Sequence, residues 1–164
     1  MLRRNKNKVL AIVGIAAIVL GLGSMVVGGF AWSYTRSTAI EQGVEVNEDA
    51  DFPFADEGQT LNDPFDMLGQ ANAIETHQLD RTGGQYYAEM PGKVPVLDEA
   101  GNPTVDENGE AVMAPNAERD SWIKATTLIT ALQLGAMAYG LITLVIFVGF
   151  TLTATGVVFL SLRD

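Results

Sequence analysis

Two long stretches of this chain contain no charged residue, and they constrain its fold more than any other feature. Residues 9–32 form a run of 24 uncharged, mostly apolar residues, and residues 125–162 form a run of 38. A helix needs about 20 apolar residues to cross the hydrocarbon core of a bilayer. The sequence therefore predicts a mostly α-helical membrane protein in which two transmembrane helices form a hairpin.

A cleaved signal peptide is the alternative for the first stretch, because basic residues precede it and Gly29–Phe30–Ala31 loosely resembles a cleavage site. The apolar core of a signal peptide has about 7–15 residues. The run of 24 residues exceeds that length. This favours a retained transmembrane helix at residues 9–32.

The charges around the first span predict its orientation. Four basic residues lie in the first eight positions: Arg3, Arg4, Lys6 and Lys8. The positive-inside rule places residues 1–8 in the cytoplasm. A second crossing returns residues 163–164 to the same side, where Arg163 agrees with the rule. We therefore expect a plasma-membrane protein with both termini in the cytoplasm and the central segment outside it.

The segment between the spans, residues 33–122, is strongly acidic. It holds 19 acidic and four basic residues, a net charge of −15. A surface of this sign disfavours nucleic acid as a partner. The chain has no cysteine, and its single histidine, His77, excludes any site built from two imidazoles within the chain. We therefore expect no enzyme: no catalytic residue, no cofactor, no resident metal and no small-molecule substrate.

Small residues recur along the first span at alternating spacings of three and four: Gly14, Ala17, Gly21, Ser24, Gly28 and Ala31. That spacing places them on one helix face, where small side chains let two membrane helices approach closely. The second run offers a compatible set: Ala131, Gly135, Ala138, Gly149 and Gly156. We predict that the stripe packs against the second span or against a helix of another protein. The alternative is that glycines are simply common in membrane helices.

The second uncharged run is too long for one crossing. At about 1.5 Å per residue, its length is nearly twice the hydrocarbon thickness. We place the crossing at residues 139–162, with Tyr139 at the outer interface, and expect residues 123–138 to continue the helix above the bilayer. Asn116 is the predicted N-cap of this helix.

The acidic segment also contains local structure signals. The first helix is expected to overrun the bilayer as far as Gln42, and residues 64–82 are predicted to form an amphipathic helix that ends at Gly83. The apolar side of that helix is expected to pack on the overrunning parts of the two long helices; it consists of Met67, Leu68, Ala71, Ile74, Gln78 and Leu79.

Three other parts of the segment have weaker signals. Residues 44–46 suggest a short strand. Residues 94–113 contain two similar copies of a strand end followed by a turn with glycine, which predicts a β-hairpin. Residues 47–62 are acidic and interrupted by Pro53, so we expect them to be extended, and disordered when free.

Two groups of side chains are candidate ligand sites. Asp106, Asn108 and Glu110 alternate like calcium ligands, but with Asp106 as position 1 Gly109 is at position 4, where an EF-hand loop needs glycine at position 6, so a solvated acidic hairpin is favoured. A lone histidine such as His77 is more often a structural hydrogen-bonding or contact residue than a metal ligand or general base. The segment's aromatic residues are better candidates for contacts with a partner: Phe52, Phe54, Phe65, Tyr86, Tyr87 and Trp122.

The central residues resemble a known group of proteins. Residues 70–91 read QANAIETHQLDRTGGQYYAEMP and residues 116–128 read NAERDSWIKATTL. These motifs are similar to those of actinobacterial two-span membrane proteins that often carry the label "aromatic ring-opening dioxygenase", and the resemblance covers the insert helix and both spans. The label conflicts with the chemistry, because an iron site of two histidines and one carboxylate cannot be made from one histidine.

Members of this group resemble the accessory subunit, or association factor, of the actinobacterial cytochrome bcc–aa3 respiratory supercomplex. The resemblance implies a non-catalytic subunit whose partners are membrane lipid and the other subunits of that supercomplex. A stand-alone envelope receptor or sensor, which binds a ligand or cation through the acidic segment, is the alternative.

Overall fold

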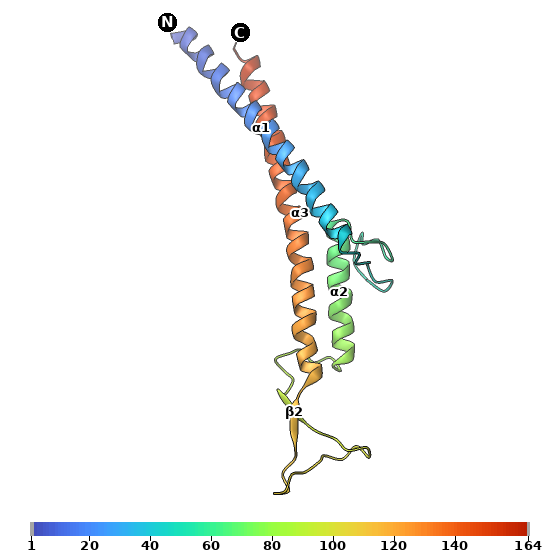
Figure 1. Ribbon diagram of the computed structural model, residues 1–164. Helices are drawn as coiled ribbons and strands as arrows, with labels where there is room; N and C mark the ends of the chain where they lie inside the picture. Colours follow the sequence, from blue (N-terminus) through green and yellow to red (C-terminus); the bar gives the residue numbers. More distant parts are fainter. Residues whose placement is uncertain (1, 164) are drawn as a thin grey trace.

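The computed structural model describes residues 2–163 of the 164-residue chain. In this part of the chain the elements follow in the order α1 (Leu2–Glu41), α2 (Pro64–Arg81), β1 (Lys93–Pro95), β2 (Met113–Pro115) and α3 (Ala117–Ser161). Figure 1 shows α1 beside the C-terminal half of α3, α2 beside its N-terminal half, and the strands beyond α3's N-terminal end. The molecule is an elongated rod. The predicted mostly helical architecture is confirmed: α1 and α3 are long and apolar enough to cross a membrane, and a small helix and a strand pair lie between them.

Helix ends follow the local signals in the sequence. The Asn116 side chain accepts hydrogen bonds from the backbone N–H groups of Glu118 (3.1 Å) and Arg119 (3.2 Å), so the predicted N-cap of α3 is confirmed. α1 ends at Glu41, and Gly43 follows with φ +61°, a left-handed conformation that suits glycine.

α2 has the predicted bounds. Asp63 caps its N-terminus by accepting hydrogen bonds from Phe65 N–H (2.7 Å) and Asp66 N–H (3.0 Å). Pro64 occupies the first turn, where its missing N–H has no cost. At the other end Thr82 is the C-cap.

α1 and α3 are antiparallel and keep a heptad register. Gly14 lies beside Gly156, and Gly21 lies beside Gly149 seven residues further along each helix. At the end of this contact the Trp32 ring meets the Tyr139 ring edge-on, with 4.7 Å between centroids. Such a register is typical of two helices that wind closely around each other.

α2 replaces α1 along the outer half of α3. Met67 near the start of α2 lies against Gly135, and Gln78 near its end donates a side-chain hydrogen bond to Ser121. The buried side chains of the junction form one apolar cluster: Val46, Ala50, Leu61, Met67, Ala73, Ala136 and Tyr139. A second, smaller cluster lies near the N-terminus of α3: Met90, Trp122 and Ala125. α2 therefore packs mainly on α3 and meets α1 only near the junction.

The segment before α2 differs from its prediction. Residues 47–62 are not extended; they form a series of turns folded against α2, and Ala50 and Leu61 are buried in the junction cluster. The expected strand at residues 44–46 is reduced to a single antiparallel bridge between Glu45 and Thr60. Both differences, the turns at residues 47–62 and the single bridge at residue 45, arise because this segment packs on α2. The local sequence carries no signal for that contact.

The predicted hairpin is also more elaborate than expected. β1 and β2 pair antiparallel and form a short stem. Beyond the stem Val96, Thr104 and Val112 form a closed ring of backbone hydrogen bonds of 2.8–2.9 Å. Two separate turns emerge from this ring and are closed by bridges at residues 97/103 and 105/111. Each of the two similar sequence copies forms its own turn, one at residues 97–103 and one at residues 105–111. The segment therefore has two turns beyond one stem, where a single hairpin was predicted.

Candidate interaction surface

The predicted helix-packing glycines of α1 contact α3. A Cβ atom added at Gly14 would lie 2.9 Å from the carbonyl oxygen of Gly156, and one at Gly21 would lie 2.5 Å from that of Gly149. At Gly28 the added atom would lie 2.5 Å from Cγ1 of Ile146. Backbone therefore lies against backbone at the first two positions, and no side chain fits there.

The other predicted packing residues fall into two groups. Ala17 and Ser24 are half-buried, and the Ser24 hydroxyl donates 2.9 Å back to the carbonyl oxygen of Leu20. Gly135 packs on α2: a Cβ added there would lie 2.6 Å from the sulfur of Met67. The small residues of the second run thus meet two different neighbours, α1 at Gly149 and Gly156 and α2 at Gly135.

Two polar side chains of α2 hold the 44–62 segment in place. The carboxylate of Asp66 is fully buried and accepts hydrogen bonds from the backbone N–H groups of Asp56 (2.9 Å) and Asn62 (3.1 Å). The side-chain oxygen of Gln70 accepts one from Asn47 N–H at 2.8 Å. Sequence reasoning missed both residues; their positions on the buried face of an amphipathic helix were the available signal.

His77 also contacts this segment. Its Nε2 lies 2.6 Å from a carboxylate oxygen of Asp49, and both side chains are exposed. The hydrogen bond to His77, assisted by its charge, lowers the pKa of Asp49 below the usual value. The contact joins the segment to the outer face of α2, which fits the structural role favoured for this histidine.

The six aromatic residues predicted to touch a partner form two separate groups. Phe52 is half-buried next to Gly69, whereas Phe54 is 81% exposed and Phe65 is 43% exposed. The rings of Phe54 and Phe65 meet edge-on with 5.5 Å between centroids. These three lie where α2 begins.

The second aromatic group lies where α2 ends. Trp122 is buried and donates its indole N–H to the carbonyl oxygen of Gln85 at 3.0 Å, so it chiefly packs within the chain. Tyr86 stacks on Trp122, and the guanidinium of Arg119 lies 3.8 Å from the centroid of the Tyr87 ring. The tyrosines are partly exposed and border the surface described next.

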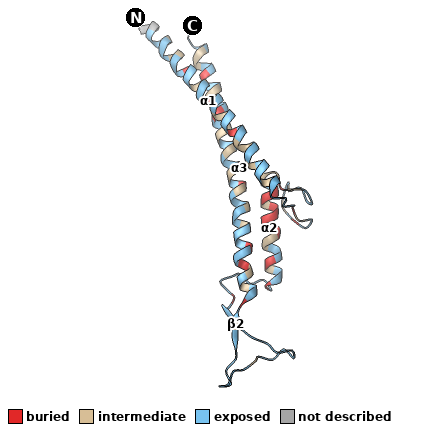
Figure 2. Cartoon of the chain, in the orientation of Figure 1, coloured by how far each residue is buried: buried red, intermediate tan, exposed pale blue. Residues whose placement is uncertain are grey.

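One face of outer α3 is apolar and uncovered. Ile123, Leu134 and Met137 are exposed, at spacings of eleven and three residues that keep them on one helix face. That face is opposite the side on which Ala125, Ala136 and Tyr139 are buried. We call these three residues the outer seam. Figure 2 shows how little of α3 is buried along this stretch.

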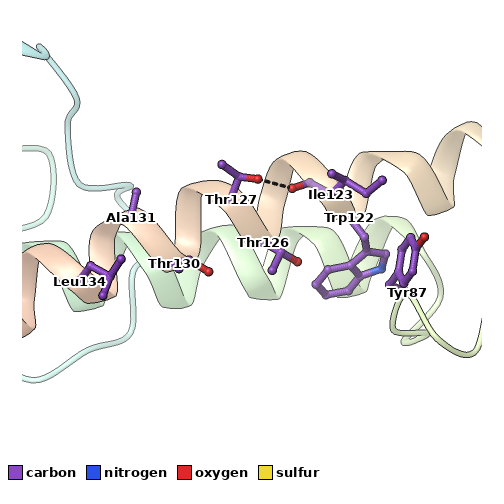
Figure 3. Close-up of a pocket in the computed structure, with 8 residues that line it drawn as sticks. All are labelled: Tyr87, Trp122, Ile123, Thr126, Thr127, Thr130, Ala131 and Leu134. Carbon is purple, nitrogen blue, oxygen red and sulfur yellow. Dashed lines mark hydrogen bonds between the residues drawn. The ribbon is translucent and has the colours of Figure 1, made fainter.

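An apolar groove of about 710 Å³ follows the outer seam. Tyr87 and Trp122 border one end and Leu134 the other, and threonines at 126, 127 and 130 lie between them. Figure 3 shows these side chains along the outside of α3, with α2 behind the helix. The sequence predicts that residues 123–138 continue the helix above the bilayer and that the 64–82 helix packs on them; the exposed face on the other side of residues 123–138 is the feature that it does not predict.

Two groups outside the groove have shifted pKa values. The Asp106 carboxylate accepts backbone N–H bonds from Glu110 and Asn108 within its own turn, and they lower its pKa. A hydrogen bond from the Tyr86 hydroxyl to Glu75, at 3.2 Å, raises the pKa of Tyr86. Among the described residues, no group of three histidine, aspartate or glutamate side chains is placed to hold a metal ion.

The chain was compared with protein-family models, curated proteins and solved structures. No protein-family model, curated protein or solved structure matches the chain.

Proposed function

We propose that this chain is a non-catalytic accessory subunit of a membrane protein complex, and that the complex is the cytochrome bcc–aa3 respiratory supercomplex of an actinobacterial plasma membrane. The resemblance of residues 70–91 and 116–128 suggests the identity of the complex. The outer seam of α3 supports the role: it is an apolar helix face that the residues described by the structure leave exposed.

The helix register supports the proposed membrane crossing. Trp32 lies beside Tyr139, and at the other end the register brings residue 9 level, within one residue, with residue 162. The two crossings inferred separately from the sequence, 9–32 and 139–162, therefore coincide in height. Each has 24 residues, about 36 Å of helix, which matches a hydrocarbon core of about 30 Å.

This placement leaves the outer seam outside the hydrocarbon core. Met137 and Leu134 are then at the level of the headgroups and Ile123 lies above them, and α2 covers one side of residues 123–138 only. Burying a large apolar side chain is worth roughly 1.5–3 kcal/mol, so an exposed apolar helix face along this stretch favours a partner that covers it. The same helix face continues through Leu141 into the proposed span, which favours a partner helix that also crosses the membrane.

Charge favours a different protein over a second copy as that partner. The outer segment, residues 33–122, has a net charge of −15, and two copies side by side would repel each other. A neutral or basic outer surface on the partner avoids this cost. The accessory subunit is therefore proposed to stabilise the assembly through helix packing, with its termini in the cytoplasm.

Purification from native membranes tests the proposal. A tagged chain, solubilised in mild detergent, should co-purify with stoichiometric cytochrome subunits identified by mass spectrometry and haem absorbance. Changing Ile123, Leu134 and Met137 together to glutamine should reduce the co-purified haem at least tenfold, because it removes the apolar contact.

The matched control changes two exposed apolar residues of the turns, Leu97 and Val105, to glutamine. This variant should retain the cytochromes. Recovery of the parent chain as a free monomer or homodimer would contradict the proposal and favour a stand-alone receptor or sensor.

A second experiment addresses catalysis. Because His77 lies on the exposed face of α2 and contacts Asp49, His77→Ala should leave electron-transfer turnover of the complete assembly within about twofold of the parent. A large loss of turnover in an assembly that retains all its subunits would point to a catalytic or proton-transfer role.

A further inference from the structure

The Phe54–Phe65 pair is an exposed aromatic feature that the proposed subunit contact does not use. Phe54 is 81% exposed and its backbone has φ +67°, a left-handed conformation that is unfavourable for a bulky side chain. Among the residues that the structure describes, Phe54 is the only one other than glycine with a positive φ. Strained backbone conformations of this kind cluster at ligand contacts and other functional sites, which makes Phe54 a candidate contact residue.

Neighbouring contacts give the height of this pair along the rod. The Tyr139 hydroxyl donates to the carbonyl oxygen of Asn62 at 3.2 Å, and Met67 lies against Gly135. Residues 62–67 are therefore level with residues 135–139 of α3. Phe65 lies within this range, and the Phe54 ring is 5.5 Å from its ring.

That level is the outer boundary of the proposed spans. Trp32 and Tyr139 mark the end of the apolar region, and the headgroup layer extends about 5–8 Å further on each side. Trp and Tyr concentrate in this layer in membrane proteins, and Phe is common on the apolar faces of segments that lie in it. Both phenylalanines at this height are exposed, and Figure 1 shows the 47–62 segment on one side of the rod at the start of α2.

We propose that Phe54 and Phe65 insert into the outer interface of the bilayer that the chain crosses, and that they anchor the start of α2 to the membrane surface. The proposal rests on the membrane placement given above. Lipid is thus the occupant of this surface, distinct from the protein helix proposed for the outer seam.

The surrounding charges define the lipid chemistry. Four acidic residues lie close to the pair along the chain: Asp51, Asp56, Glu57 and Asp63. An acidic rim repels anionic headgroups, so attachment depends on the aromatic rings. The contact is therefore expected to form with zwitterionic lipid and to need no anionic lipid.

Photo-crosslinking in proteoliposomes of phosphatidylcholine tests the proposal with the full chain. Phe54 is replaced by the photoreactive analogue benzoylphenylalanine, which keeps an aromatic ring at the position. The same analogue at Phe30, which is exposed within the proposed span, reports membrane insertion, and at Leu97, in a turn far from α2, it reports background. We expect phospholipid adducts at Phe54 and Phe30 at least tenfold above those at Leu97.

The outcomes separate this inference from the proposed membrane placement. Adducts at Phe30 with none at Phe54 overturn the aromatic anchor and leave the spans in place. Background levels at both positions overturn the spans and the anchor together. A protein–protein adduct at Phe54 as the main product also overturns the inference, because it assigns the pair to a protein partner.

A second measurement uses the backbone strain. Asparagine tolerates a left-handed conformation better than phenylalanine, so Phe54→Asn relieves the strain and removes the ring together. If the ring is anchored in the interface, hydrogen exchange of the Phe52 and Ala55 amides in the Phe54→Asn variant should become at least fivefold faster in the proteoliposome than in the parent. Exchange that is unchanged or slower overturns the proposal.

Discussion

Single residues of this chain contribute in two main ways: glycines allow close contact between helix backbones, and buried polar side chains accept hydrogen bonds from backbone N–H groups. Gly21 and Gly149 let two backbones touch, since any side chain on either would enter the opposite helix. Asp66 supplies two acceptors for backbone N–H groups that the acidic segment leaves unpaired. Neither effect depends on the helix propensity of the residue. Both depend on which part of the chain lies opposite it in the folded structure.

Gly21→Leu should weaken the α1–α3 contact. A leucine there must displace the backbone at Gly149, and overpacking of this kind costs roughly 1–3 kcal/mol. An SDS titration followed by tryptophan fluorescence, in a Trp122→Phe background so that Trp32 alone reports, should show the lower stability, because Trp32 packs on Tyr139 at the end of the same contact. Gly23→Leu is the control: no atom lies within 4 Å of a Cβ added at Gly23. Equal midpoints for the two variants would contradict the packing assignment.

Asp66→Ala should loosen the segment before α2. Its removal leaves the N–H groups of Asp56 and Asn62 without their acceptor, and a buried unsatisfied group costs roughly 1–3 kcal/mol. Hydrogen exchange at these two amides should become at least tenfold faster. Asp51→Ala, at an exposed aspartate of the same segment, should leave both rates near those of the parent.

The Asp49–His77 contact predicts a pH dependence. The pKa of Asp49 is lowered in the folded chain, so its contribution to stability is present above the ordinary value of about 3.9 and is lost as pH falls through the lowered pKa. After correction for intrinsic exchange rates, protection of the Ala50 amide should therefore fall below about pH 4. Asp49→Asn should lack this step. An identical pH profile in the variant would show that another group is responsible.

Among the elements, α3 is a single helix that meets different neighbours along its length. α1 covers its C-terminal half and α2 covers the same face of its outer half, while the outer seam remains uncovered. The change of neighbour occurs at Tyr139, which is fully buried between Trp32 and Asn62. The 42–63 segment connects the end of α1 to the start of α2. α2 therefore continues the pairing with α3 from the point where α1 ends.

The α1–α3 register can be tested with cysteines, because the chain has none of its own. A Cβ added at Gly149 would lie 3.0 Å from Cβ of Ser24, so the helices must move apart there by about 1 Å to admit the cysteine and to reach the range of about 3.5–4.5 Å that a disulfide needs. The Ser24→Cys/Gly149→Cys variant should therefore cross-link within one chain on oxidation. Ser24→Cys/Gly156→Cys is displaced by seven residues, about 10 Å of helix, and should not. Efficient cross-linking of the displaced pair would exclude this register.

In the whole molecule, apolar and acidic regions are separated along the rod. The two apolar helices lie side by side at one end, and the acidic loops and turns lie along α2 and beyond the strands at the other (Figure 1). Basic residues of the first eight positions lie at the end of the rod far from the acidic loops. This arrangement supports the proposed topology and the proposed contact with a larger membrane assembly.

Reporter fusions test that topology. A fusion at Gly101, in an exposed turn, should be active with alkaline phosphatase and inactive with a cytoplasmic reporter, because the segment is expected outside the cytoplasm. Fusions after Leu162 should give the opposite result. A cytoplasmic reporter that is active at Gly101 would invert the proposed orientation.

Much of this fold follows from the sequence, because its signals act over a few residues. Asn116 and Asp63 cap helices through N–H groups two and three positions away, and the uncharged runs determine which helices are long and apolar. The tertiary structure decided the rest: the turns of residues 47–62, the placement of Gly135 on Met67 and the outer seam. Each of these depends on which helix face lies opposite, and the same small or apolar residue suits several partners. Only the three-dimensional packing of α2 beside α3 selects among them, and it leaves one apolar face of α3 uncovered.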